Sequence, residues 1–166
     1  GYTNGLDWPM LVKYYGNRNF TSKLIFHVSM PKPFRLAEQY LIRAEAYCRK
    51  NDFTKAGNDL TALRKMRYAS GGTLNVSKNN WLQTISDERV RELYMEGFRL
   101  HDLKRWGKEY ADLNGGYSIR RTPQSCSQPE GSSLKITPDI PLFVWPIPQH
   151  ELESPGSEIL PNESNR

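Results

Sequence analysis

The sequence contains little of the chemistry on which most metal and cofactor sites depend. Its 166 residues include 2 cysteines and 3 histidines. His27, His101 and His150 are far apart along the chain, so no short ligand spacing connects them. Cys48 falls on the apolar side of a helical pattern and Cys126 in a polar stretch, so we expect two inert thiols. There is also no glycine-rich loop that could cradle a phosphate. We therefore predict no metal and no cofactor.

Long apolar runs and long basic runs are missing as well. Hydrophobic residues make up 37% of the chain, and no window approaches the roughly 18 consecutive apolar residues of a membrane-spanning helix. A basic start followed by an apolar stretch is not found, so no signal peptide is expected. The formal net charge is +5, but the basic residues are scattered and the densest group alternates with glutamates. This pattern excludes nucleic acid as the expected partner.

Two helices are predicted early in the chain. The first follows Pro33, which suits the first turn of a helix, and its apolar residues recur at helical spacing as far as Asn51. Asp52 is placed to cap the second helix, which is predicted over residues 53–67. Because the turn between the two helices is short, we expect an antiparallel hairpin.

The spacing of small and large residues in this hairpin is similar to that of a tetratricopeptide repeat. Small Ala44 and large Tyr47 are followed by Ala56 in the second helix. A free-standing solenoid needs at least about three such units, and one is visible here. We interpret the pair as a tetratricopeptide-like hairpin within a larger fold. A tetratricopeptide-type scaffold that binds a peptide is an alternative, and it would need a concave groove lined by Tyr40 and Arg43.

Further helices are predicted over residues 79–95 and 98–110, separated by Gly97. Residues 111–140 are polar, rich in proline and serine and without period, so they predict a long loop. A brief helix is expected at residues 149–152.

The patterns together predict an all-α protein in three segments. Residues 1–33 form an irregular lead-in, in which the alternation over residues 24–30 suggests a short strand. Residues 34–110 form the helical core, and residues 111–166 form an irregular C-terminal segment.

The most charged part of the helical core still keeps an apolar period. Leu82, Ile85 and Leu93 share one helix face, and the turn between the last two is filled by Arg89. Since arginine and glutamate are almost never buried unless paired, we predict an ion-pair network beneath this helix. The network is predicted to consist of Arg89, Glu92, Glu96, Arg99 and Asp102.

A catalytic interpretation of the same region is possible but is not favoured. Glu88, Glu92 and Glu96 are spaced so that two carboxylates lie close together on one helix, as in a retaining glycosidase. Each of them has an arginine three positions away, and a nearby cation lowers the pKa of a carboxyl group. No glycine-flanked nucleophile is present. We predict no catalytic residue, although a polysaccharide-degrading enzyme with an unpaired carboxylate pair in a cleft is a second alternative.

Three stretches in fixed order resemble the SusD/RagB family. Arg35 to Tyr47 is similar to the family's "R.AE.YL.RAEA" helix. Glu88 to Gly107 resembles its "ER…EL…EG.R..DL.RWG" signature, and Pro141 to Leu152 resembles its closing "PIP..EL" segment. No one of these motifs is specific alone, but their combination is.

The resemblance implies a function without bond chemistry. Members of the family are outer-membrane lipoproteins at the cell surface that capture a glycan or other nutrient and deliver it to a TonB-dependent SusC-like transporter. They are also much longer than this chain. The resemblance therefore implies that the chain is the C-terminal part of one larger SusD-like domain, whose preceding part is a further partner.

The residues that would contact a ligand are less well indicated. Flat aromatic rings stack on the C–H faces of sugars, and polar side chains beside them bind hydroxyl groups. Trp8, Tyr14 and Tyr15, with Arg18 nearby, form the best such group, although packing in a core or an interface is the favoured explanation of these rings. In the family the ligand contacts come largely from loops outside the three motifs, so no binding residue is transferred.

Overall fold

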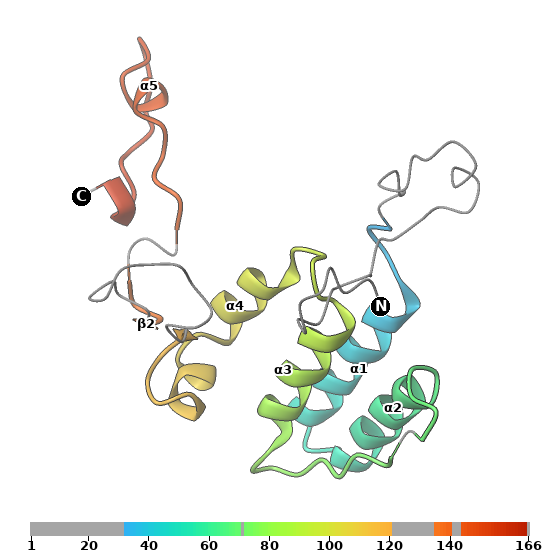
Figure 1. Ribbon diagram of the computed structural model, residues 1–166. Helices are drawn as coiled ribbons and strands as arrows, with labels where there is room; N and C mark the ends of the chain where they lie inside the picture. Colours follow the sequence, from blue (N-terminus) through green and yellow to red (C-terminus); the bar gives the residue numbers. More distant parts are fainter. Residues whose placement is uncertain (1–31, 71, 121–134, 141–143, 166) are drawn as a thin grey trace, which may run out of the picture. The chain divides into compact units, whose positions relative to one another are not determined.

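The computed structural model describes residues 32–70, 72–120, 135–140 and 144–165. The chain divides into two compact units, Gly1–Arg35 and Leu36–Arg166. The second unit contains, in chain order, α1 (Leu36–Arg49), α2 (Phe53–Lys65), α3 (Trp81–Glu92), α4 (Phe98–Leu113), β1 (Ile119–Arg120), β2 (Lys135–Ile136), α5 (Gln149–Leu152) and a 3₁₀ turn at Glu163–Asn165 (Figure 1). The predicted all-α class is confirmed.

The first two helices form the expected hairpin. Asn51, with φ of 61°, turns the chain, and the Asp52 carboxylate accepts a hydrogen bond of 3.2 Å from the N–H of Lys55 at the start of α2. Ala44 and Ala56 are both fully buried, because small side chains allow the two helices to approach closely. This close approach is what brings side chains of α1 and α2 within bonding distance of each other.

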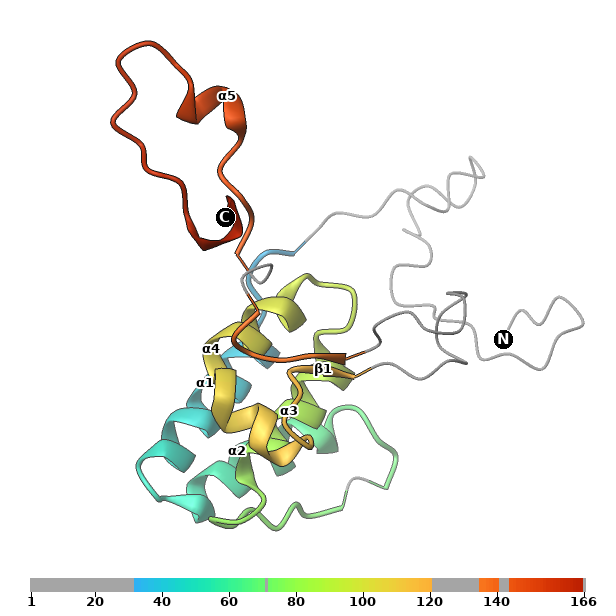
Figure 2. The same cartoon turned by 90° about the vertical axis from the view of Figure 1, so that its left-hand side faces the viewer.

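Helix α3 packs against α1, and the two lie side by side in both views of the ribbon (Figures 1 and 2). Its inward face carries Leu82 and Ile85, which are 3% and 0% exposed. The core to which they belong also contains Leu93, which directly follows α3, and buried side chains of the other helices, namely Leu41, Leu60, Leu103, Trp106 and Tyr110. The apolar stripes of the sequence therefore face one shared core.

The ends of the helices differ from the prediction. Helix α3 ends at Glu92 and not at Met95, because Leu93 already departs from helical geometry, with φ of −103° and ψ of 18°, and Met95 has a positive φ of 60°. Gly97, with φ of 84°, then precedes α4, in agreement with the predicted break. Helix α4 continues to Leu113 and contains a kink at Gly107, whose φ of 49° favours glycine.

The region predicted as an unstructured loop contains a small hairpin. Strands β1 and β2 are antiparallel, with Ile119 opposite Ile136, and the N–H of Ser118 donates a hydrogen bond of 2.8 Å to the carbonyl of Ile136. Ile119 also packs against the helical core. Strands of two residues are too short to show an alternating pattern, which explains why the sequence did not reveal them.

Other predictions have mixed outcomes. Helix α5 coincides with the brief helix expected at residues 149–152. Cys48 is buried, and burial raises the pKa of its thiol to about 11. The strand expected over residues 24–30 and Cys126 lie outside the described residues. No described helix has the length and apolar character that crossing a membrane requires.

Candidate functional site

The centre of the charged region is a buried ion pair between α3 and α4. Arg89 and Asp102 are 5% and 3% exposed, and the Nε of Arg89 donates a hydrogen bond of 2.7 Å to Oδ2 of Asp102. The guanidinium of Arg89 also lies 5.9 Å from the ring centre of Phe98. Of the carboxylates predicted as partners of Arg89, the structure thus brings Asp102 to it.

Glu45 of α1, which was not among the predicted members of the network, accepts hydrogen bonds from three residues. It is 5% exposed, and both terminal nitrogens of Arg105 donate to it, at 2.5 and 2.6 Å. The indole N–H of Trp106 adds a bond of 3.0 Å and Arg49 two of 3.2 Å. Burial by itself raises the pKa of Glu45, but the bonds from Arg105 and Trp106 outweigh it, and the pKa lies below its usual value.

Arg105 joins these two centres into one chain of charges. Besides Glu45, its Nε donates a bond of 3.0 Å to the second carboxylate oxygen of Asp102. A continuous series of ion pairs therefore runs through Arg89, Asp102, Arg105 and Glu45. It connects α3 to α4 and α4 to α1. Sequence reasoning missed Glu45 and Arg105. Glu45 lies on the buried face of α1, between Leu41 and Cys48, and this position is the signal that could have revealed it.

Two more bonded carboxylates join α3 to α2 and to the turn that follows α2. Glu88 is 4% exposed and accepts bonds of 3.1 and 2.5 Å from Arg64 as well as a bond from Arg91, three positions along its own helix. Glu92 accepts two bonds from Arg67, at 2.8 and 2.9 Å. This arginine lies just beyond the C-terminal end of α2, whereas Arg89, three positions before Glu92, turns inward to α4.

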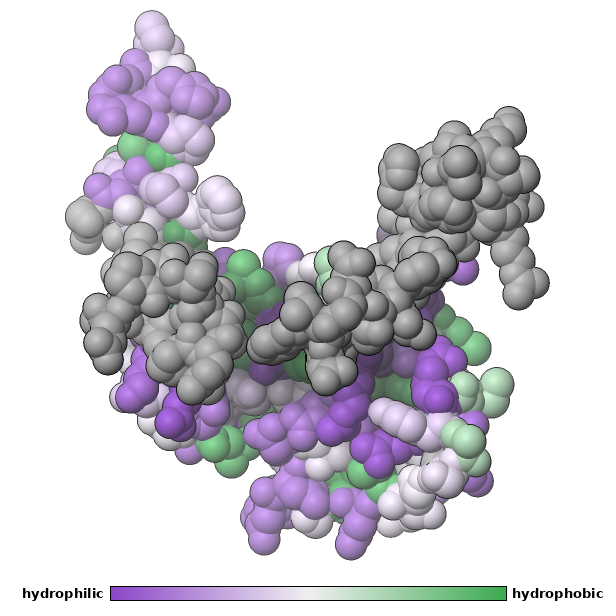
Figure 3. Space-filling model, viewed as in Figure 1, coloured by the Kyte–Doolittle hydropathy of each residue, from purple (hydrophilic) through white to green (hydrophobic). Residues whose placement is uncertain are grey.

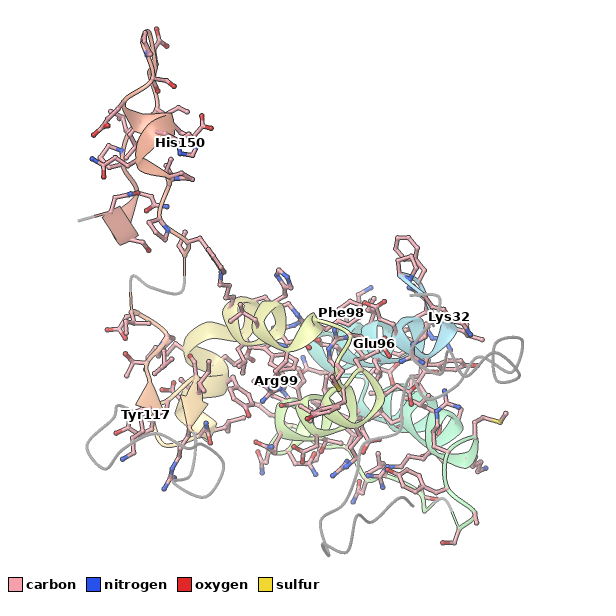
Figure 4. The ribbon with its side chains drawn as sticks, turned by 45° about the horizontal axis from the view of Figure 1, so that its top comes forward. Lys32, Glu96, Phe98, Arg99, Tyr117 and His150 are labelled. Carbon is pink, nitrogen blue, oxygen red and sulfur yellow. The ribbon has the colours of Figure 1, made fainter. Side chains whose placement is uncertain are left out.

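The remaining predicted members of the network have other surroundings. Arg99 donates to the hydroxyl groups of Ser86, at 2.8 Å, and Tyr110, at 2.9 Å, and its guanidinium lies 5.1 Å from the centre of the Tyr110 ring. Glu96 is half-buried at the turn that separates α3 from α4. Figure 4 shows Glu96, Phe98 and Arg99 close together at this turn.

The geometry leaves these carboxylates little capacity for acid–base chemistry. A general acid or base needs an oxygen that can reach a substrate, but the oxygens of Glu45 and Glu88 are buried and bonded to arginine. The hydrogen bonds from Arg105 and Trp106 also keep the pKa of Glu45 below its usual value, which favours its ionised form. Among the described residues, no cluster of three or more histidine, cysteine, aspartate or glutamate side chains is arranged to hold a metal ion.

Two surface depressions accompany the network. One, of about 450 Å³, lies between α1 and α4 and includes Glu38, His101 and Arg105 in its wall. The other, of about 390 Å³, is mainly apolar and lies at the turn between α3 and α4. Both depressions include Arg89 and Asp102 in their walls.

The remaining residues that the sequence suggested for binding are of two kinds, those proposed for a glycan and those proposed for a peptide. Trp8, Tyr14, Tyr15 and Arg18 lie outside the described residues. Tyr40 and Arg43 do share a shallow depression of about 350 Å³. Arg43 joins the two helices of the hairpin, because it donates hydrogen bonds of 2.8 and 2.7 Å to Asp59 of α2. That bond fixes the guanidinium on the hairpin and reduces its capacity to bind a peptide.

A protein-family model and a related protein both match this chain. The model of the SusD family matches residues 8–157. The starch-binding protein SusD of Bacteroides thetaiotaomicron is 37% identical over 111 residues, which are 64% of this chain and 18% of that protein. The chain thus spans less than a fifth of the length of this relative. No solved structure matches the chain significantly.

Proposed function

We propose a function from one premise, which is that the chain belongs to the SusD family. The proposed function is capture of a glycan at the outer surface of a bacterial outer membrane, by a lipid-anchored protein of which this chain forms a part. The captured glycan would pass to a TonB-dependent SusC-like transporter. In this proposal the helices described here act mainly as scaffold and as a surface for partners.

The observation that carries the proposal is the family match, which extends from residue 8 to residue 157 and includes all of α1 to α5. The relative with 37% identity is named for binding starch, so an α-linked glucan is the first ligand to test. Binding suits the geometry better than catalysis does, because Glu45 and Glu88 are bonded to arginine.

Affinity electrophoresis tests this proposal directly. The purified chain and the complete product of its gene are run in native gels that contain soluble starch, another polysaccharide or none. Slower migration of the complete product in one of the glycan gels is the expected result. Migration that no glycan changes would contradict the proposal.

The proposed absence of catalysis has its own assay. The same preparations are incubated with the retarding glycan, and the release of reducing ends is measured. We expect none. Release that disappears in a Glu88→Gln or Glu92→Gln variant would show that a carboxylate of the network is catalytic.

The transporter needs a different experiment, because nothing in the geometry of this chain identifies it. The complete product is extracted from the membrane with detergent and purified by an affinity tag. Copurification of a TonB-dependent transporter in stoichiometric amount is expected. A transporter that is absent from the eluate, while the tagged protein still binds glycan, would contradict the delivery step alone.

A further inference from the structure

Helix α4 is followed by a dipeptide, Asn114–Gly115, whose two residues can react with each other. In deamidation, the backbone nitrogen of the glycine attacks Cγ of the asparagine. A new N–Cγ bond forms, and the side-chain nitrogen leaves as ammonia with the proton of the attacking N–H. Water then opens the cyclic imide to aspartate or isoaspartate. Glycine favours the attack, because it has no side chain to hinder it.

The backbone at this end of the helix leaves the attacking nitrogen without a hydrogen bond. Asn114 is the C-cap of α4, and the N–H of Gly116 donates a bond of 2.7 Å to the carbonyl of Ala111. This is the outer bond of a Schellman motif, whose inner bond runs from the N–H of Gly115 to the carbonyl of Asp112. In the part of the chain that the structure describes, the inner bond is not formed.

Solvent has access to the same nitrogen. Gly115 and Gly116 are exposed, and no atom beyond the chain neighbours lies within 4 Å of a Cβ built on Gly115. Hydrophilic residues cover much of the helical region on the face that Figure 3 shows. Water, which the second step of the reaction consumes, therefore reaches this end of α4.

The carboxamide, in contrast, is held away from the attacking nitrogen. The side-chain N–H of Asn114 donates a bond of 2.9 Å to the carbonyl of Tyr117, which lies beside the end of α4 (Figure 4). Asn114 has ψ of 33°, and at this angle the nitrogen of Gly115 points away from Cβ of Asn114. Ring closure needs both on the same side of the Cα–C bond. That rotation requires the bonds to Tyr117 and Ala111 to open.

We propose that Asn114 is a deamidation site that is gated by the C-terminal end of α4. The closed helix end prevents the reaction, and local opening permits it. Such an opening costs less free energy than unfolding of the whole domain, because the ends of elements open independently of the core. The proposal concerns the chemistry of the chain itself and does not depend on glycan capture.

The product keeps the helix end open. Deamidation replaces the amide that donates to Tyr117 by a carboxylate, which cannot donate when it is ionised. A negative charge at the C-terminal end of a helix is also unfavourable because of the helix dipole. The residues that follow are Ser118, whose N–H is bonded to the carbonyl of Ile136, and Ile119, which packs against the core. The reaction thus turns a transient opening into a lasting weakening of the connection between α4 and β1.

Peptide mass spectrometry tests the gate, because it measures the conversion of each asparagine separately. The purified chain is incubated in neutral buffer, once folded and once in concentrated urea. Asn4 also precedes a glycine and serves as the reference in the urea sample. In urea we expect Asn114 and Asn4 to react at equal rates. In the folded chain we expect Asn114 to react at least about tenfold more slowly than in urea, since only the opened fraction reacts. Equal rates at Asn114 in the two conditions would overturn the proposal.

A pair of core substitutions distinguishes local opening from global unfolding. Ile119→Ala weakens the packing next to the helix end, whereas Val76→Ala removes apolar volume from the same core at a position before α3. Both variants are incubated well below their Tm. We expect Ile119→Ala to accelerate conversion of Asn114 several-fold and Val76→Ala to leave it unchanged. Equal acceleration by both, or no conversion in Ile119→Ala while the urea sample reacts, would overturn the proposal.

Asn114→Asp imitates one product and tests its effect without waiting for the reaction. Hydrogen exchange is measured at the amide of Ser118, which bonds to Ile136, and at the amide of Ala44 within α1 as a control. We expect exchange at Ser118 to become several-fold faster in Asn114→Asp and exchange at Ala44 to stay the same. Unchanged exchange at Ser118 would show that the product does not hold the helix end open.

Discussion

Asp102→Ala is expected to destabilise the chain strongly, and more than Arg89→Ala. Breaking a buried ion pair by removing one partner costs roughly 3–5 kcal/mol, and the two residues are 5% exposed or less. Without Asp102, Arg89 retains as its described partner the Phe98 ring, 5.9 Å away. Without Arg89, Asp102 still accepts the 3.0 Å bond from Arg105. We therefore place Asp102→Ala near the upper end of the range, at about 5 kcal/mol, and Arg89→Ala near the lower end, at about 3 kcal/mol.

A loss of this size is easily measured, because a whole domain is typically stable by about 5–15 kcal/mol. Urea unfolding followed by far-ultraviolet circular dichroism gives the free energy of unfolding for each variant. Asp112→Ala is the matched control, since Asp112 pairs with Lys108 on the same helix but is 58% exposed. The control is expected to change stability by less than about 1 kcal/mol.

The double variant Arg89→Met/Asp102→Leu separates packing from charge. Replacing a buried pair by apolar side chains of similar volume is often neutral or stabilising, so this variant should recover most of the loss. If Asp102→Ala were no more destabilising than Asp112→Ala, the structural role of the pair would be refuted. Equal losses for Arg89→Ala and Asp102→Ala would refute the narrower claim that Arg105 supports Asp102.

Further predictions concern other parts of the structure. The depressed pKa of Glu45 means that its carboxylate stabilises the fold above its ordinary pKa near 4.5, and that this contribution is lost as the pH falls through the folded pKa. Glu45→Gln should lower Tm at neutral pH and flatten its fall in acid; an unchanged acid limb would contradict this. Gly107→Ala should lower the free energy of unfolding in urea by roughly 1–2 kcal/mol, because alanine is strained at a φ of 49°. The added Cβ meets no neighbouring atom within 4 Å, so backbone strain alone accounts for this loss. In a Cys126→Ser background, Cys48 should react with a thiol reagent after unfolding but not in the folded chain, since its pKa is about 11; rapid labelling of folded protein would show that the thiol is accessible.

The helices could be predicted from the sequence because their signals are local. An apolar stripe depends on residues three and four apart, and the capping by Asp52 involves its near neighbour Lys55. The place of Arg89 was also recognisable, since a charged residue on an apolar stripe must either be paired or disrupt the core. These inferences needed no knowledge of how the helices pack.

The partners of the charged residues could not be predicted in the same way. Glu45 is bonded to Arg105 and Trp106, which are 60 and 61 positions away, and Glu92 is bonded to Arg67, 25 positions away. The sequence left Glu92, Glu96 and Asp102 open as partners of Arg89, and their spacing could not choose among them. The direction of an arginine side chain is set by the helix packed above it, which a single sequence does not specify.

The positions of these bonds also explain why a region so rich in charge does not have to be a ligand site. Arg64 and Glu88 join α2 to α3, Arg89 and Asp102 join α3 to α4, and Glu45 joins α1 to α4. A charged side chain that holds two helices together already uses hydrogen-bonding groups on other parts of the protein. Substitutions here should therefore weaken glycan capture by unfolding the scaffold rather than by removing a contact. A binding measurement on such a variant has meaning only beside its unfolding curve, and a variant that lost binding while keeping full stability would show that the network itself meets the ligand.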